Sequence, residues 1–317
     1  MALLTIYALP KSFQDDHIAR IQRNAVRSWL QLDPKPVILV FGDEPGVAEH
    51  CAEFGLTRVT GPLEVIDGTV RLRDLAVKAE AVSDTPFYCF INADIILTSD
   101  LTKALLEIAP RFPRFLLGAS PWNVRIREDL EFGAGWEAAL ERRAIAEDDL
   151  RSRQCSDFFL YPKGYLATAP ELLIGRVYVD NGMMWWVRQR RDPLIDGTPG
   201  ILTVHQHHRY GHLGDMADRQ HETVGAAWNV KAIGGRNHIY TWASATDHYT
   251  KAGIQPFWMG RICRWSTHDK GSWASTVFMK LLWRPAAVLS RPLRKAFGLI
   301  DPARVNARPT SRAAKRQ

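Results

Sequence analysis

The chain has few cysteines and no long apolar run. Its four cysteines, Cys51, Cys89, Cys155 and Cys263, lie far apart and form no Cys-x-x-Cys pair. Such spacing is typical of reduced, buried thiols and argues against a disulfide framework and against a thiolate zinc site. No stretch reaches the roughly 18 uncharged apolar residues that a membrane-spanning helix needs. We therefore predict no transmembrane anchor.

A basic segment is missing from the N-terminus. The first ten residues, MALLTIYALP, are apolar, but no positive charge precedes the apolar run as it would in a secretory signal peptide. We interpret them as a first β-strand. Together with the reduced cysteines, this predicts a cytoplasmic protein. With 317 residues, of which 46% are hydrophobic, the chain can bury the core of one large domain.

Positive charge is concentrated at the C-terminus. Residues 261–317 contain 13 Lys or Arg against two acidic residues, whereas the rest of the chain has 28 basic and 32 acidic residues. We expect this basic tail, rather than the body, to contact polyanions. An anionic membrane surface is the partner we favour, since each Lys or Arg near such a surface contributes ~1 kcal/mol. Nucleic acid is not expected because no nucleic-acid-binding motif is present, and a simply solvated tail remains open.

The first half alternates apolar runs with amphipathic segments. Strands are expected at residues 3–9, 36–42, 57–60 and 87–97, and helices at about 15–32, 46–55 and 71–83 and from residue 100. Uniformly apolar strands separated by helices predict a mostly parallel sheet buried on both faces, that is, an α/β/α sandwich. In such a sheet, ligands bind beyond the carboxyl ends of the strands.

The second half has shorter apolar runs between loops rich in Trp, Gly and Arg. Helices are expected at 136–153 and 179–191, and short strands around 115–120, 157–162 and 200–206. We predict that residues 1–110 and 111–255 are two halves of one domain. The first half would bind a nucleotide, and the second would bind an acceptor and complete a metal site. Residues 256–317 would form a basic helical extension.

The sharpest local signal is Asn92-Ala93-Asp94, within the apolar segment 87–97. Polar groups in a buried strand are costly to desolvate unless something binds them. If the strand continued through the motif, its period of two would point Asn92 and Asp94 the same way, toward a cation or a ribose. A turn that merely closes the strand is the alternative.

A histidine cluster follows a second apolar strand. His205, His207, His208 and His212 lie within eight residues of a chain that has ten histidines. By strand alternation His205 and His207 would share one face, with His208 opposite. Histidines in this arrangement are candidate metal ligands, and a polar surface loop is the alternative.

Two carboxylates are candidate general bases. Asp180 stands at the start of the helix predicted at 179–191, beside aromatic residues such as Trp185 that could stack on a sugar ring. A helix-capping Asp would explain the same residue. Asp157, at the start of a predicted strand, should reach the same cleft.

Three weaker candidates belong to the first half. Asp43 follows an apolar strand, where the base of a nucleotide would lie, although a turn before Pro45 explains it equally well. Arg73 and Lys78 lie on one predicted helix and could steer phosphate, or could simply be solvated.

Three features resemble the GT-A glycosyltransferases: the Asn-Ala-Asp strand, the preceding segment 71–79 and the histidine run. In that family a DxD motif holds a divalent ion against a nucleotide sugar. The resemblance covers residues 3–249 and implies a GT-A (Rossmann-like) fold. It implies Mn²⁺ or Mg²⁺ on Asp94 and His205, with Asn92 on the ribose or sugar and His208 or His212 on phosphate or acceptor. Asp43, Arg73 and Lys78 would contact a UDP- or GDP-linked donor.

The resemblance therefore implies transfer of a sugar to a hydroxyl acceptor, such as a glycan or a lipid-linked saccharide, on the inner face of a membrane. Asp180 as the base would make the reaction inverting, and a retaining route stays open. A zinc-dependent hydrolase built on the cluster from His205 to His212 is the alternative from another class. A binding protein that kept the fold without activity is another. A nucleotidyltransferase is disfavoured because no Gly-rich phosphate loop follows the first strand.

Overall fold

The structure is a computed structural model that describes residues 2–208 and 220–262. Its centre is a nine-stranded sheet. In spatial order the strands are β14 (Gly253–Pro256), β13 (Asp247–Thr250), β11 (Leu194–Asp196), β8 (Leu116–Gly118), β10 (Phe158–Pro162), β6 (Phe87–Ile91), β1 (Leu4–Ala8), β2 (Val37–Phe41) and β3 (Thr57–Val59). Only β10 and β14 run antiparallel to their neighbours, so the predicted mostly parallel sheet is confirmed.

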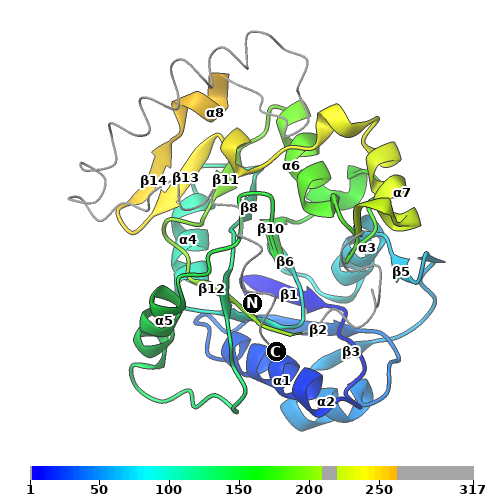
Figure 1. Ribbon diagram of the computed structural model, residues 1–317, viewed down its shortest axis with the longest axis vertical. Coiled ribbons are helices and arrows are strands. Elements are labelled where there is room, and N and C mark those ends of the chain that lie inside the picture. Colours follow the sequence, from blue (N-terminus) through cyan, green and yellow to red (C-terminus); the bar gives the residue numbers. More distant parts are fainter. Residues whose placement is uncertain (1, 209–219, 263–317) are drawn as a thin grey trace, which may run out of the picture.

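Helices cover both faces of the sheet (Figure 1). One face carries α1 (Asp16–Trp29), α2 (Val47–Phe54) and α4 (Asp100–Ile108), and the other carries α3 (Leu72–Val82), α6 (Val179–Gln189) and α7 (Val224–Ala232). Neighbouring strand residues such as Ile6 and Tyr7 point into the two different cores, because side chains alternate across a strand. The predicted α/β/α sandwich is therefore confirmed.

A second, three-stranded sheet lies against the first. It consists of β7 (Ile95–Leu97), β12 (Thr203–Gln206) and β9 (Trp122–Val124), in the order β7-β12-β9. Helix α5 (Trp136–Glu147) covers it through a small core that contains Leu140, Ala144 and Val204. This sheet joins the Asn-Ala-Asp region to the histidine run, because β7 follows the first and β12 begins the second.

The remaining elements are short. They are the hairpin β4 (Val65–Ile66) and β5 (Thr69–Val70), the 3-10 turns Tyr165–Thr168, Arg236–His238 and Trp242–Ser244, and α8 (Trp258–Ile262). Of the predicted basic extension at 256–317, only the part up to residue 262 is described. The predicted membrane-binding tail and His212 lie outside the described residues.

Two predicted elements were wrong in extent. The apolar segment 87–97 is not one strand, because the chain turns at residues 92–94 and separates β6 from β7. The helix predicted at 136–153 ends at Glu147, where Asp148 takes a left-handed backbone conformation (φ 49°) that an α-helix cannot continue through.

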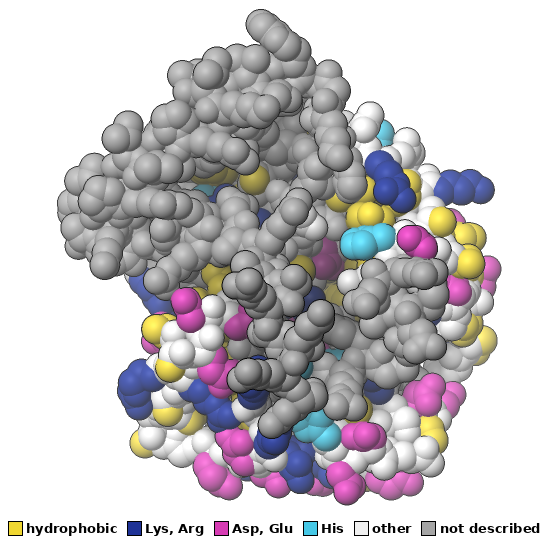
Figure 2. All heavy atoms as spheres, viewed as in Figure 1, with side chains coloured by type: hydrophobic (Ala, Val, Ile, Leu, Met, Phe, Trp, Pro, Cys, Tyr) yellow, Lys and Arg dark blue, Asp and Glu magenta, His cyan; other side chains and the backbone are white. Residues whose placement is uncertain are grey.

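No helix among the described residues combines the length and apolar character needed to cross a membrane. On the face shown in Figure 2, acidic and basic side chains are mixed over the lower part of the molecule, where α1 and α2 lie.

Candidate functional site

The Asn-Ala-Asp motif forms a turn at the carboxyl end of β6. The turn is closed by the Ile95 amide, which donates to the Asn92 carbonyl at 3.2 Å, and it is tied to β10 by the Asn92 amide, which donates to the Asp157 carbonyl at 2.9 Å. Asn92 and Asp94 therefore do not lie in one continuous strand, which was the basis for predicting that their side chains point the same way. The turn still places the Asp94 carboxylate at the edge of the sheet where ligands of α/β proteins bind.

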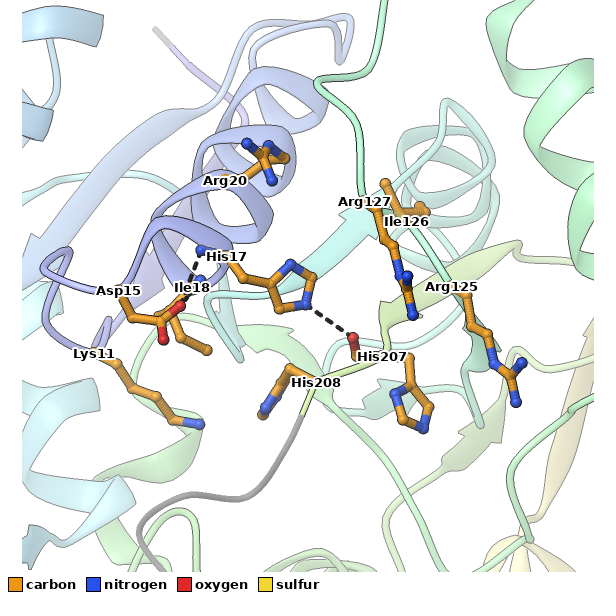
Figure 3. A pocket seen from close by; sticks show the side chains of 10 residues that line it. All are labelled: Lys11, Asp15, His17, Ile18, Arg20, Arg125, Ile126, Arg127, His207 and His208. Atoms are coloured by element: carbon orange, nitrogen blue, oxygen red, sulfur yellow. Dashed lines mark hydrogen bonds between the residues drawn. The ribbon is translucent and has the colours of Figure 1, made fainter. Parts of the chain in front are cut away.

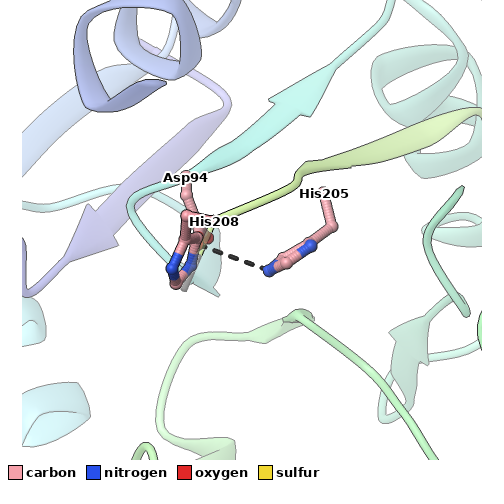
Figure 4. A group of neighbouring side chains, drawn as sticks. All are labelled: Asp94, His205 and His208. Atoms are coloured by element: carbon pink, nitrogen blue, oxygen red, sulfur yellow. Dashed lines mark hydrogen bonds and ion pairs between the residues drawn. The ribbon is translucent and has the colours of Figure 1, made fainter. Parts of the chain in front are cut away.

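Asp94 lies beside two histidine rings, those of His205 and His208 (Figure 4). His208 Nε2 donates to Asp94 Oδ2 at 2.7 Å, and His205 Nε2 lies 3.5 Å from the same oxygen. Asp94, His205 and His208 each offer one potential ligand atom, and these three atoms all lie within 4.8 Å of one another. The prediction that His208 would face away from His205 was wrong, because β12 ends at Gln206 and the chain no longer alternates beyond it.

The electrostatics of this group favour a cation. Burial alone would raise the pKa of Asp94, but His205, His208 and Lys11 outweigh it and hold that pKa at about 2. Burial lowers the pKa of His205, against the attraction of Asp94. At neutral pH the site therefore presents a carboxylate and a neutral His205 imidazole, which are the protonation states that bind metals.

One buried oxygen of the group has no partner among the described residues. Asp94 Oδ1 is shielded from solvent and accepts no hydrogen bond from any described residue. A buried carboxylate oxygen without a partner is costly unless a ligand binds it. Two imidazoles and a carboxylate are ligands that Mn²⁺, Mg²⁺ or Zn²⁺ accept to different degrees. The residues present therefore fit a divalent cation.

A polar residue that the sequence analysis missed supports the cluster. Gln206 is fully buried in β12, and its Nε2 donates to the carbonyls of Asp94 (3.0 Å) and Ile21 (2.7 Å). Its Oε1 accepts from Asn24 on α1 at 3.1 Å. Gln206 thus fixes the Asn-Ala-Asp turn to α1. A buried glutamine between two histidines was the signal that could have identified it.

Asp157 is buried immediately before β10 and is fully engaged. Its Oδ1 accepts from Asn92 Nδ2 at 3.0 Å, and its Oδ2 accepts from Arg151 at 3.0 Å. Asn92 therefore contacts Asp157 rather than pointing alongside Asp94. With both oxygens held by protein donors, Asp157 is suited to position its neighbours.

Asp180 lies in the first turn of α6 rather than at its N-cap. The N-cap is Tyr178, a non-glycine residue with a left-handed backbone (φ 75°). Asp180 Oδ2 accepts from the Ser156 amide at 3.0 Å. Burial and the nearby charge of Asp157 raise the pKa of Asp180 to about 8, against the opposing Ser156 bond and Arg151. A carboxyl with a pKa near 8 exchanges its proton close to physiological pH.

These groups line one cavity of about 470 Å³. Its walls come from the carboxyl ends of β1 and β6, the start of α6, the segment before β10 and the end of β12. Asn92, Asp94, His205 and His208 lie on its lining together with Asp157 and Asp180. The structure thus brings both predicted carboxylate candidates and the predicted metal pair into one space.

The three predicted nucleotide contacts in the first half do not line this cavity. Asp43 is exposed and pairs with Arg58. Arg73 pairs with Glu171 at 2.8 Å, and Lys78 Nζ lies beside Gly61. Their roles in binding a donor stay predictions.

The aromatic run in α6 does not face the cavity either, so the expected sugar-stacking role for it was wrong. Trp185 stacks on His238, and Trp186 is buried against Tyr165. These side chains lie on the face of α6 that packs into the protein core. Tyr178 and His221, with ring centroids 5.4 Å apart, are aromatic residues that do line the cavity.

A buried asparagine fixes the loop in front of α6. Asn229 in α7 accepts from the Leu173 amide at 2.7 Å and donates to the carbonyls of Leu173 and Val177, both at 3.1 Å. It is completely buried. Asn229 therefore positions the segment 173–177, which leads into Asp180.

No protein-family model and no curated protein matches the chain. Solved structures do match. Glucosyl-3-phosphoglycerate synthase from Mycobacterium tuberculosis, solved with Mn²⁺, UDP and phosphoglyceric acid, is 14% identical over 74% of this chain and 79% of its own, with a TM-score of 0.45. S. aureus TarS 1-349 in complex with UDP-GlcNAc is 13% identical over 41% of this chain and 37% of its own, with a TM-score of 0.31.

These likenesses are distant. The topology is that of a mostly parallel sheet covered by helices on both faces, with an Asn-Ala-Asp turn at its carboxyl edge. The chain therefore has the mostly parallel α/β/α sandwich that its sequence predicts.

Proposed function

We propose that this protein is a glycosyltransferase that moves a sugar from a nucleoside diphosphate donor to a hydroxyl group. One observation carries the proposal. A candidate cation site, Asp94 with His205 and His208, lines the same cavity of about 470 Å³ as a carboxyl group, Asp180, whose pKa lies near neutrality. A cavity of this size accommodates a small-molecule substrate.

Asp94, His205 and His208 would hold Mg²⁺ or Mn²⁺. When bound, the ion neutralises charge on the diphosphate leaving group. The ionised Asp94 and the neutral His205 are ready to bind it without proton loss. Gln206 keeps the Asn-Ala-Asp turn in place through its bond to the Asp94 carbonyl. UDP and GDP are the donor nucleotides we expect.

Asp180 would remove the proton from the acceptor hydroxyl. A general base works best when its pKa lies near the operating pH, and burial beside Asp157 brings the pKa of Asp180 to about 8. Arg151 and Asn92 hold Asp157, so its charge is fixed close to Asp180. Direct attack assisted by such a base inverts the anomeric centre. We expect a glycan or lipid-linked acceptor, in keeping with the basic residues 261–317.

Calorimetric titration of UDP and GDP, with and without Mn²⁺, tests the donor site. We expect one nucleotide to bind the full-length protein only when Mn²⁺ is present. The Asp94→Asn, His205→Ala and His208→Ala variants should bind it at least tenfold more weakly. Asp84→Asn, which neutralises an exposed carboxylate paired with Lys163, is the matched control and should bind normally. Failure of both nucleotides to bind under any metal would refute the transferase.

A zinc hydrolase remains the second candidate, because two histidines and one carboxylate are also a zinc ligand set. It predicts the opposite pattern: tight Zn²⁺ binding that depends on the same three residues, with no nucleotide binding. The same calorimetric series with Zn²⁺ in place of Mn²⁺ separates the two.

A further inference from the structure

A second cavity, of about 750 Å³, adjoins the first (Figure 3). It is bounded by the start of α1 and the residues before it, by the segment that follows β9, and by the residues that follow β12. Lys11, Ile18 and His208 line both cavities, whereas Asp94, Asp157 and Asp180 line only the first. We call this second space the basic pocket. A ligand that extended from one cavity to the other would pass these three shared residues.

The basic pocket carries an excess of positive charge. Among the described residues that line it, four are cations, Lys11, Arg20, Arg125 and Arg127, and one is a carboxylate, Asp15. That carboxylate is occupied, because its Oδ1 accepts from the amides of residues 17 and 18 at 2.9 Å each and caps α1. Arg20 is paired with Asp129 at 3.7 Å, so Lys11, Arg125 and Arg127 carry the excess. Cations that line one cavity attract an anion.

Arg125 and Arg127 are the best placed to bind one. Both are exposed, whereas Ile126 between them is fully buried, and this alternation places the two arginine side chains on the same, outer side of the segment. Among the described residues, no carboxylate forms an ion pair with either guanidinium. The backbone is held in place, since the Arg125 amide donates to Glu147 at 2.9 Å. Guanidinium groups bind phosphate oxygens in pairs.

The opposite wall supplies an ammonium group. In Figure 3 the Lys11 side chain points into the pocket toward His208. The wall is fixed to the segment after β12, because His17 Nε2 donates to the His207 carbonyl at 3.1 Å. Cations on two facing walls can hold an anion between them.

We propose that the basic pocket binds the phosphate group of a phosphate-bearing acceptor, whose hydroxyl then lies in the first cavity. Anion binding here stands on the charge and geometry of the pocket alone. Its assignment to the acceptor rests on the proposed function, in which the donor diphosphate belongs to the cluster around Asp94.

Inorganic phosphate titrated into metal-free, full-length protein tests the pocket without nucleotide. We expect binding that the Arg125→Gln/Arg127→Gln variant weakens at least tenfold and that added NaCl also weakens. Arg111→Gln/Arg236→Gln removes the same charge from two exposed arginines elsewhere and should bind as the wild type does. Equal binding by all three proteins, or no binding by any, would overturn the site.

A second titration identifies the occupant. Phosphate should still bind when UDP and Mg²⁺ are saturating, and UDP affinity should change less than twofold in Arg125→Gln/Arg127→Gln. If UDP excludes phosphate, or if this variant loses UDP as Asp94→Asn does, the pocket holds the donor's phosphates and the acceptor assignment is wrong. If phosphate binds and no nucleotide does, the anion site stands and the transferase fails.

Discussion

Replacement of Asp180 by Asn should stabilise the protein while it abolishes transfer. The native protein holds the Asp180 proton up to a pKa of about 8, whereas in the unfolded chain the same group ionises near pH 4. Between these values the native state binds more protons than the unfolded state, so this group lowers the free energy of unfolding as pH rises. Asn carries no charge and retains an oxygen to accept from the Ser156 amide.

The size of the gain follows from the same numbers. Each pKa unit corresponds to about 1.4 kcal/mol. The Asp180 side chain is partly open to the cavity, so we discount the energy of the full pKa shift by about half. We therefore expect Asp180→Asn to raise the free energy of unfolding by about 2 to 3 kcal/mol at pH 9, and by close to zero at pH 4. Urea denaturation of the wild type and of Asp180→Asn at pH 5, 7 and 9 measures the difference in their free energies of unfolding. The contributions of the other titrating groups, which both proteins share, cancel in this difference.

A second substitution makes this test sharper. The charge of Asp157 is one cause of the raised pKa of Asp180, so in an Asp157→Asn background the difference should level off at a lower pH. Asp157→Asn alone should destabilise the protein, because it breaks the ion pair between Asp157 and Arg151. A stability difference between wild type and Asp180→Asn that does not vary with pH would refute the reasoning.

Three further predictions concern the residues that position the site. Asn229→Ala should lower the free energy of unfolding by about 3 kcal/mol in urea titrations, because it leaves buried backbone groups of residues 173 and 177 without partners; unchanged stability would contradict this. Gly118→Ala should cost about 1 to 3 kcal/mol in the same assay, since its added carbon would lie 2.6 Å from Ser156 Oγ. Gln206→Leu should weaken Mn²⁺ binding in calorimetry, because it removes the bond to the Asp94 carbonyl. Gln220→Leu, which changes a polar residue of the cavity wall outside the cluster, should weaken it less.

The layered fold was predictable because its signals are local. The segments that became β1, α1, β2 and α3 carry uniform apolar runs or helical periodicity, and their ends differ by only a few residues from those expected. The antiparallel direction of β10 was not predictable, since strand direction depends on how the chain returns and leaves no mark in a five-residue apolar run.

The candidate site was predicted in part for a related reason. Asp94, His205 and Asp180 stood out because polar residues beside apolar strands and helices are unusual, and the structure brings them to one cavity. Arg151 acts through its bond to Asp157, and its residue type alone gave no signal. Gln206 between two histidines was a signal, but its contact with the distant Asp94 exists only in the folded chain. Arg125 and Arg127 matter only because α1 lies opposite them, which is a property of the folded chain.

The position of β10 between β6 and β8 bears on how the protein can be divided. The predicted boundary at residue 110 would divide the chain into two halves, yet β6 before it pairs along its whole length, Phe87 to Ile91, with β10 beyond it. A fragment ending at residue 110 would present β6 as a bare edge, open to pairing with other chains. Expression of residues 1–110 alone should therefore give aggregates, and a test of the proposed nucleotide binding requires the intact sheet.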